Sequence, residues 1–184
     1  MSRRRRLLLA LAVVALLGAG AAVVFYLKEV RSFAYDVVSA VLAAGSDDVR
    51  DAIARAGALT AVRGSEDFAA ISAAFKRIKN ILRQAEEKKF VIGSSETVKL
   101  ADQAQALKDA AEALAPRVAI LREERAYVPA LTEIATLRPV VDTFFDKVMV
   151  LDPDPAIRAA HLGLIDEVLR SFSTIADFSE IETG

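Results

Sequence analysis

The sequence predicts an all-α fold, a helical bundle preceded by one apolar helix at the N-terminus. Three observations support this prediction. Apolar residues recur at steps of three and four along most of the chain, which is the period of one helix face. Gly and Pro interrupt this pattern at positions that suit helix ends. No segment alternates apolar and polar residues over a convincing length, so strands are not expected.

Residues 1–27 combine a basic start with an apolar run of membrane length. The 21 residues from Leu7 to Leu27 carry no charge, and as a helix they would span about 31 Å, close to a hydrocarbon thickness of about 30 Å. A signal peptide cleaved near Ala19–Ala21 is one interpretation, but the length of the run favours an uncleaved anchor. In either case Arg3–Arg6 would direct the following domain out of the cytoplasm. A misassigned start on a truncated gene is a third interpretation.

Residues 28–184 are expected to form one helical domain. A first helix should stop at Gly45, and a short helix opened by Asp47 and Asp48 should follow it. Ser65 is a good N-cap for the next helix. The apolar positions of that helix recur at steps of three and four, which predicts a single buried face made of Phe68, Ile71, Phe75, Ile78 and Leu82.

Proline marks the helix ends in the second half of the chain. Residues 88–97 contain Gly and Ser and are the most loop-like stretch. An Ala-rich helix over about 98–115 should end before Pro116, because the residue before a proline disfavours the helical conformation. A helix over about 117–137 should follow, with Pro129 at a break or in a first turn.

Two further helices should complete the domain. Pro139 suits the first turn of a helix that reaches Val150. Asp154 can cap the final helix and Pro155 can occupy its first position, and this helix should continue to about Thr174.

The composition excludes most metal-binding and catalytic chemistry. The chain has no cysteine and one histidine, so thiolate ligands, paired-histidine metal motifs and a Ser-His-Asp arrangement are not available. We therefore expect no cofactor and no catalysis by this chain alone. Of its 24 basic residues, four are Arg3–Arg6, and the other 20 stand against 25 acidic residues. An anionic partner would therefore have to meet a local basic patch.

One such patch lies on the helix that begins after Ser65. Lys76, Lys79, Asn80 and Arg83 follow one another at i, i+3, i+4 and i+7, and no acidic residue lies between Lys76 and Arg83. Cations held at fixed spacing suit phosphate contact, and an Asn amide can contact a base. An ordinary solvated helix face is the alternative interpretation.

The stretch 137–150 is the second candidate for binding. Arg138 and Lys147 are its exposed cations, and the other large side chains are expected to pack as core: Phe144, Phe145, Val148 and Met149. His161 falls on the apolar line of the last helix, which predicts a partly buried residue in preference to a functional one.

Three stretches of the sequence are similar to a known family. FKRIKNIL (75–82), LRPVVDTFFDKVMV (137–150) and IADFS (175–179) resemble, in order, the C-terminal region of the bacterial-type glycyl-tRNA synthetase β subunit. FYLKEVRSFAYDVVSAVLAAG (25–45) looks like the segment that leads into that region. The resemblance thus extends over about residues 25–184. It implies a helical anticodon-binding domain of the DALR-like type that arginyl-tRNA synthetase also has.

The resemblance also implies which residues contact tRNA. Carried onto matching positions of this sequence, the contacts are Lys76, Arg77, Lys79, Asn80, Arg138 and Lys147, and Arg83 belongs to the same basic stripe. Where the family usually has Asn-Arg in the last helix, this chain has Ala160-His161, which puts a contact from that position in doubt.

The function expected from the resemblance is tRNA anticodon recognition in support of glycyl-tRNA aminoacylation. In the family a separate α subunit holds the glycine and ATP sites, so tRNA and an α subunit are the implied partners. The family is cytoplasmic, whereas Leu7–Leu27 argues for inner-membrane anchoring. The alternatives are a membrane-anchored or exported helical domain that binds proteins, and a non-functional truncated fragment.

Overall fold

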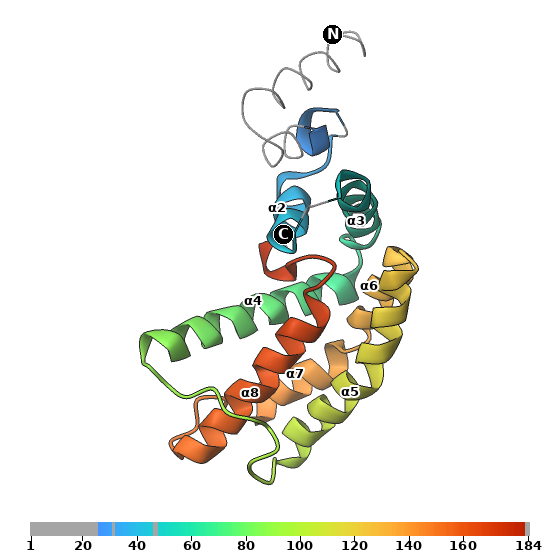
Figure 1. Ribbon diagram of the computed structural model, residues 1–184. Helices are drawn as coiled ribbons and strands as arrows, with labels where there is room; N and C mark the ends of the chain where they lie inside the picture. The colour runs from blue at the N-terminus through green and yellow to red at the C-terminus, as the bar shows by residue number, and fades with distance from the viewer. Residues whose placement is uncertain (1–25, 31, 46–47, 183–184) are drawn as a thin grey trace.

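The computed structural model describes residues 26–30, 32–45 and 48–182, and all of its regular structure is helical (Figure 1). No strand occurs among these residues, which confirms the all-α prediction. In chain order the elements are η1 (Tyr26–Val30), α2 (Tyr35–Ala43), α3 (Val49–Val62), α4 (Glu66–Glu87), α5 (Asp102–Glu123), α6 (Tyr127–Ala135), α7 (Arg138–Lys147), α8 (Pro155–Phe172) and η2 (Phe178–Glu180).

The predicted apolar segment Leu7–Leu27 lies outside the described residues, apart from its last two positions. Within the described part of the chain, no helix has both the length and the apolar character needed to cross a membrane.

The first helix boundaries follow the predicted caps. After α2 the chain turns at Gly45, whose φ of 96° is a left-handed conformation that glycine adopts without strain. The carboxylate of Asp48 then accepts hydrogen bonds from the backbone N–H groups of Arg50 (2.8 Å) and Asp51 (3.3 Å), so it caps α3 as expected. Asp47, the other predicted opener, is not among the described residues.

Helix α4 is built as the sequence predicts. The Ser65 hydroxyl accepts a hydrogen bond from the backbone N–H of Phe68 at 3.2 Å and caps the helix. Four of the five predicted apolar positions (Phe68, Ile71, Phe75 and Ile78) are fully buried, whereas Leu82 is only partly buried. One face of α4 therefore belongs to the core, and the opposite face is left to solvent.

The prediction that a helix ends before Pro116 is wrong. Helix α5 continues through Pro116 to Glu123. Pro116 lies on the exposed side of α5. Since proline has no backbone N–H, the carbonyl four residues earlier receives no helical hydrogen bond, and water can satisfy it there. The opposite side buries Leu114 and Val118, on either side of the proline along the chain, and this packing outweighs the local preference.

The prediction of a helix over about 117–137 is wrong, because residues 117–123 continue α5 and α6 begins only at Tyr127. Helices α7 and α8 keep their predicted starts but not all of their predicted core. Pro129 lies in the first turn of α6, Pro139 in the first turn of α7, and Asp154 caps α8. Helix α7 ends at Lys147, three residues early, so Met149 is 65% exposed and its predicted place in the core is wrong. Phe144 is fully buried as predicted, and its partly buried neighbours Phe145 and Val148 pack against the core from the edge.

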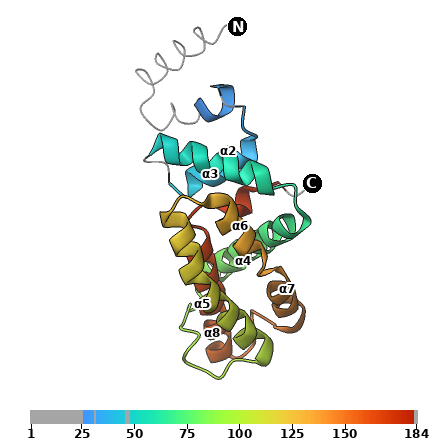
Figure 2. The same cartoon turned by 90° about the vertical axis from the view of Figure 1, so that its right-hand side faces the viewer.

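The C-terminal segment returns to the first helices and packs between them and α4. In Figures 1 and 2, α2 and α3 lie together at one end, and the segment after α8 passes between them and α4. Phe178 inserts there, with its ring edge-on to Phe68 (centroids 5.4 Å apart) and to Phe75 (5.3 Å). All three rings are fully buried, so this cluster connects η2 to α4.

We expect Phe178→Ala to lower the free energy of unfolding by about 3–5 kcal/mol, because it removes a fully buried ring and leaves a cavity against α4. Chemical denaturation of the full-length chain measures this. Val91→Ala is the matched control, since Val91 is 73% exposed and its truncation should change stability by less than about 0.5 kcal/mol. Equal effects of the two substitutions would contradict the packing.

Candidate functional site

An open groove of about 860 Å³ runs along the exposed face of α4. The C-terminal η2 forms one wall and the chain just after α4 forms its end. Of the eleven lining residues four are basic and two are acidic, although the whole chain has a net charge of −1. The lining residues are Lys76, Lys79, Asn80, Leu82, Arg83, Glu86, Lys89, Phe90, Ile92, Ser179 and Glu180.

The groove brings together the predicted basic stripe. Lys76, Lys79, Asn80 and Arg83 all line it, as their spacing on one helix face implies. Asn80 and Arg83 are also joined, since the Arg83 guanidinium donates to the Asn80 side-chain oxygen at 3.4 Å. Arg77 is the exception. Its guanidinium lies 4.2 Å from the centroid of the Phe145 ring, so it points away from the groove toward α7.

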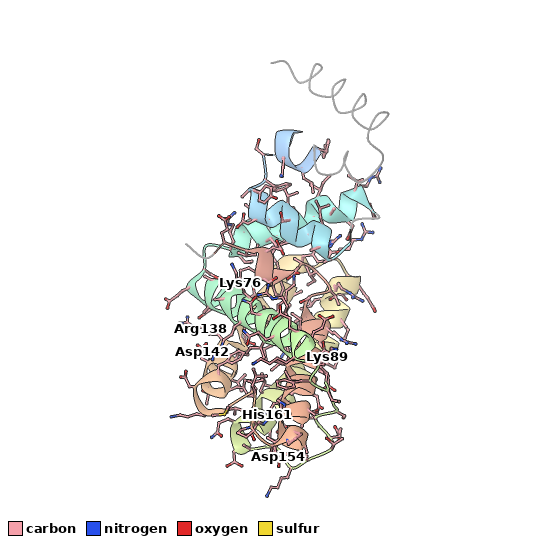
Figure 3. All side chains as sticks on the ribbon, turned by 90° about the vertical axis from the view of Figure 1, so that its left-hand side faces the viewer. Lys76, Lys89, Arg138, Asp142, Asp154 and His161 are labelled. Atoms are coloured by element: carbon pink, nitrogen blue, oxygen red, sulfur yellow. The ribbon has the colours of Figure 1, made fainter. Side chains whose placement is uncertain are left out.

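The two cations predicted from the second stretch also lie outside the groove. In Figure 3, Lys76 lies on α4 and Lys89 lies at the end of α4, whereas Arg138 lies on the neighbouring helix α7. Arg138 pairs with Asp67 (2.8 Å) and Glu66 (3.2 Å) at the start of α4, and hydrogen bonds to these two carboxylates raise the pKa of the guanidinium. Lys147 is exposed at the end of α7.

Lys79 holds the C-terminal wall of the groove against α4. Its ammonium donates to the Asp177 carboxylate at 2.5 Å and to the Ser179 hydroxyl at 3.2 Å, and Glu180 lies 3.8 Å away. Burial of Asp177 opposes its ionisation, but the hydrogen bonds from Lys79 and Ser179 outweigh this effect and lower the pKa of the carboxyl. Lys79 therefore shapes the groove as well as lining it.

The end of the groove was not predicted from the sequence. Lys89 ends α4 in a left-handed conformation (φ 56°), and its backbone N–H donates to the Glu86 carbonyl at 2.9 Å. The N–H of Phe90 then donates to the Ala85 carbonyl at 2.8 Å. This turn directs Phe90 and Ile92 into the groove. An aromatic residue directly after a helix and beside a basic stripe was the signal that could have found it.

The loop beyond this turn is fixed on α8. The backbone N–H of Gly93 donates to the Ala159 carbonyl at 2.9 Å. At Gly163, a Cβ would lie 1.9 Å from the Gly93 carbonyl oxygen, so only glycine permits this approach. Two residues beyond Gly93, the buried Ser95 hydroxyl donates to Glu167 at 3.3 Å. The loop-like stretch is therefore held in place, and it fixes the end of the groove.

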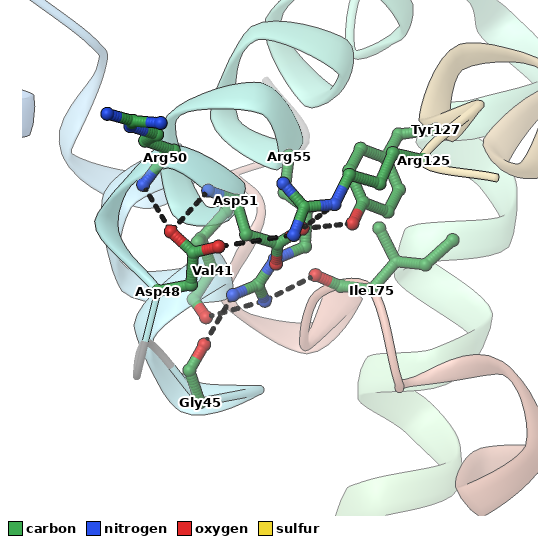
Figure 4. A network of polar contacts seen from close by, with 9 residues as sticks. All are labelled: Val41, Gly45, Asp48, Arg50, Asp51, Arg55, Arg125, Tyr127 and Ile175. Carbon is green, nitrogen blue, oxygen red and sulfur yellow. Dashed lines mark hydrogen bonds and ion pairs between the residues drawn. The ribbon is translucent and has the colours of Figure 1, made fainter. Parts of the chain in front are cut away.

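A second polar cluster, between α2, α3 and α6, is structural (Figure 4). Arg55 is 6% exposed and pairs with Asp51 at 2.8 Å. Burial and a hydrogen bond to Asp51 raise the pKa of Tyr127 to about 12. Four of the five N–H groups of Arg55 donate within the protein, to Asp51 and to the backbone carbonyls of Val41, Gly45 and Ile175, so we assign no ligand to it.

His161, predicted to be partly buried from its position on the last helix, is buried. It is 5% exposed, its Nδ1 is 3.2 Å from the Met149 carbonyl oxygen, and its ring lies edge-on to Phe144. Among the described residues no group of acidic or histidine side chains is arranged to hold a metal ion.

A family model described as the DALR anticodon binding domain matches residues 71–183. The match begins in α4, extends through η2 and contains every residue that lines the groove. The chain belongs to this family. The helical anticodon-binding type expected from the resemblance is thereby confirmed.

The curated relatives of this DALR domain are much longer proteins. The chain is 60% identical to the glycine–tRNA ligase beta subunit of Acidobacterium capsulatum over 163 residues, which are 85% of this chain and 23% of the relative. It is 42% identical over 149 residues to that of Geobacter metallireducens (80% and 21%), and 37% identical over 164 residues to that of Moorella thermoacetica (85% and 22%). The chain thus spans about a quarter or less of the relatives' length.

Because of the Lys79–Asp177 pair, the free energy of unfolding of this DALR domain should fall at acidic pH. Since the pKa of Asp177 is lowered by folding, its contribution is complete above the ordinary value of 3.8 and is lost as the pH falls through the lowered value. Asp177→Asn, which can still cap η2, should flatten the fall in urea midpoint between about pH 6 and pH 2.5. Asp146→Asn, at an exposed position, removes the same charge and should leave the profile unchanged. Identical profiles for both variants would contradict the assignment.

Proposed function

We propose that this chain is a tRNA-recognition module that binds the anticodon stem-loop in the groove along α4. The observation that carries the proposal is the coincidence of this groove with the region that matches the DALR anticodon-binding family. Cations on a rigid helix can contact successive phosphates, and phosphate contacts supply most of the affinity for a nucleic acid.

The roles proposed for the groove residues follow from their surroundings. Lys76 and Lys89 are exposed, and neither has an ion-pair partner in the described part of the chain, so their ammonium groups are available to phosphates. Arg83 is exposed two turns of helix from Lys76 and can provide a third contact. We assign Lys79 to holding the groove wall, and Asn80 to contact with a base edge.

The relatives are subunits of a larger enzyme, which suggests the complex in which this module acts. We propose that the module contributes to glycyl-tRNA formation when it is part of a complete glycine–tRNA ligase, as in the beta subunits that it resembles. A catalytic α subunit would then bind glycine and ATP, and this chain would orient the tRNA without taking part in a covalent step.

The phosphate assignment predicts a weaker dependence of binding on salt. Changing Lys76, Arg83 and Lys89 together to Gln should weaken binding of stem-loops of any sequence. It should also flatten the plot of log affinity against log salt by about 0.7–0.9 for each phosphate that the variant no longer neutralises. The measurement is a salt titration of stem-loop affinity for the whole chain.

The matched control removes the same charge from exposed positions outside the groove: Arg50, Lys99 and Arg122, each changed to Gln. Its salt slope should stay close to that of the wild type. Equal flattening in both triple variants would mean that binding follows overall charge and not the groove. A wild-type chain that binds no stem-loop at low salt would refute the proposed function.

Asn80→Ala tests base contact separately from phosphate contact. Removal of an amide that reads a base edge should reduce the preference for glycine-type over unrelated anticodon loops, while the salt slope stays nearly constant. A variant that is less stable but keeps its preference would assign Asn80 to local structure, through its bond with Arg83.

The cations on the α7 side require their own test. Arg77, Arg138 and Lys147 are also predicted as tRNA contacts from the sequence, but Arg77 and Arg138 are engaged within the protein. We expect Arg77→Gln and Lys147→Gln to change stem-loop affinity less than Lys76→Gln does. A larger effect would place the RNA on the α7 side of α4.

A further inference from the structure

Phe90 gives the groove a feature that phosphate contact alone does not explain. It lines the groove together with Lys89 and Ile92, the other lining residues from the chain just after α4. Its side chain is only partly buried. The Arg158 guanidinium lies 4.2 Å from its ring centroid, which stabilises the ring from the α8 side.

The backbone that carries the ring is fixed on both sides of Phe90. Before it, the turn at Lys89 closes α4 with the hydrogen bond from the Phe90 N–H to the Ala85 carbonyl at 2.8 Å. After it, Gly93 is fixed on α8 through its bond to the Ala159 carbonyl and its close approach to Gly163.

Arg158 is fixed as well. Its guanidinium donates to the backbone carbonyls of Asp152 (2.7 Å) and Pro153 (3.3 Å), in the turn that precedes α8. The other cation close to the ring is Lys88, whose ammonium lies 5.8 Å from the centroid on an exposed side chain. The pair of Phe90 and Arg158 thus enters any complex already ordered, so binding costs little conformational freedom.

We propose that Phe90 is a stacking platform for one unpaired nucleobase, so that the groove selects a single-stranded RNA segment over a duplex. This inference rests on the proposed function and adds the state of the RNA that the groove accepts. A base within a duplex is covered on both faces by its neighbours, whereas an unpaired base can stack on an aromatic side chain. The nearby cations Lys89 and Arg83 would hold the adjoining phosphates.

A matched aromatic residue elsewhere on the molecule provides the control. Arg77 lies over Phe145 at the same distance, 4.2 Å, and Phe145 is also partly buried, but this pair faces α7 and does not line the groove. The two pairs therefore have the same arginine-to-ring distance but lie at different places on the molecule.

The binding experiment compares Phe90→Leu and Phe145→Leu in the full-length chain, against an RNA hairpin with a seven-nucleotide loop and against a fully paired RNA of the same number of phosphates. Phe90→Leu should weaken hairpin binding roughly 5- to 150-fold, the range for removing one stacked base, with little change for the duplex and an unchanged salt slope. Phe145→Leu should leave both affinities within about twofold of the wild type. Phe90→Tyr, which keeps the aromatic face, should retain the hairpin affinity of the wild type, and the unchanged duplex affinity of Phe90→Leu excludes a general failure of that variant to fold.

A fluorescence experiment tests stacking itself. The chain has no tryptophan, so Phe90→Trp and Phe145→Trp each introduce a single indole. The hairpin should quench the indole at position 90 and not that at position 145, and the duplex should quench neither. Wild-type affinity for the hairpin together with an unaffected Phe90→Leu variant would overturn the stacking proposal and leave the proposed function standing. Failure of the wild type to bind either RNA would overturn both.

Discussion

The structure depends on the docking of its C-terminal segment against α4. The ring of Phe178 packs edge-on between Phe68 and Phe75 with centroid separations of 5.4 and 5.3 Å, and all three are fully buried. Just before it, the Ile175 carbonyl accepts a hydrogen bond from Arg55 at 3.0 Å, which connects the same segment to α3. One short segment thus covers part of the inner face of α4, connects α4 to the first helices and forms a wall of the groove on the outer face of α4.

The packing of α4 therefore determines the position of the groove. The inner face of α4 is fixed by apolar contacts, so the outer face must present its cations at helical spacing. Lys79 lies on the outer face but also stabilises the packing, because its ion pair with Asp177 holds the wall of the groove. Its neighbours Lys76 and Arg83 stay exposed. The turn after α4 is fixed on α8 through Gly93, and it places Phe90 at the end of the basic groove.

The features that could be predicted from the sequence are those that depend on local chemistry. The caps at Ser65 and Asp154 and the two faces of α4 follow from neighbours within one or two turns. The continuation of α5 through Pro116 could not be predicted, because it depends on packing against distant helices. The same holds for the site. The basic stripe was visible as a periodic pattern, and Phe90 as an aromatic residue directly after the helix, but the place of Phe90 at the end of the groove depends on the turn at Lys89 and on the contact of Gly93 with α8.

The central claim is that RNA occupies the groove along α4, and lysine footprinting tests it most directly. The full-length chain would be acetylated briefly with and without a glycine anticodon stem-loop, and modification at each lysine measured by mass spectrometry. Lys76 and Lys89 line the groove, whereas Lys99 and Lys147 are exposed elsewhere. We predict that bound RNA protects Lys76 and Lys89 and leaves Lys99 and Lys147 as reactive as in the free protein. Protection of Lys147 with unchanged reactivity at Lys76 and Lys89 would contradict the claim.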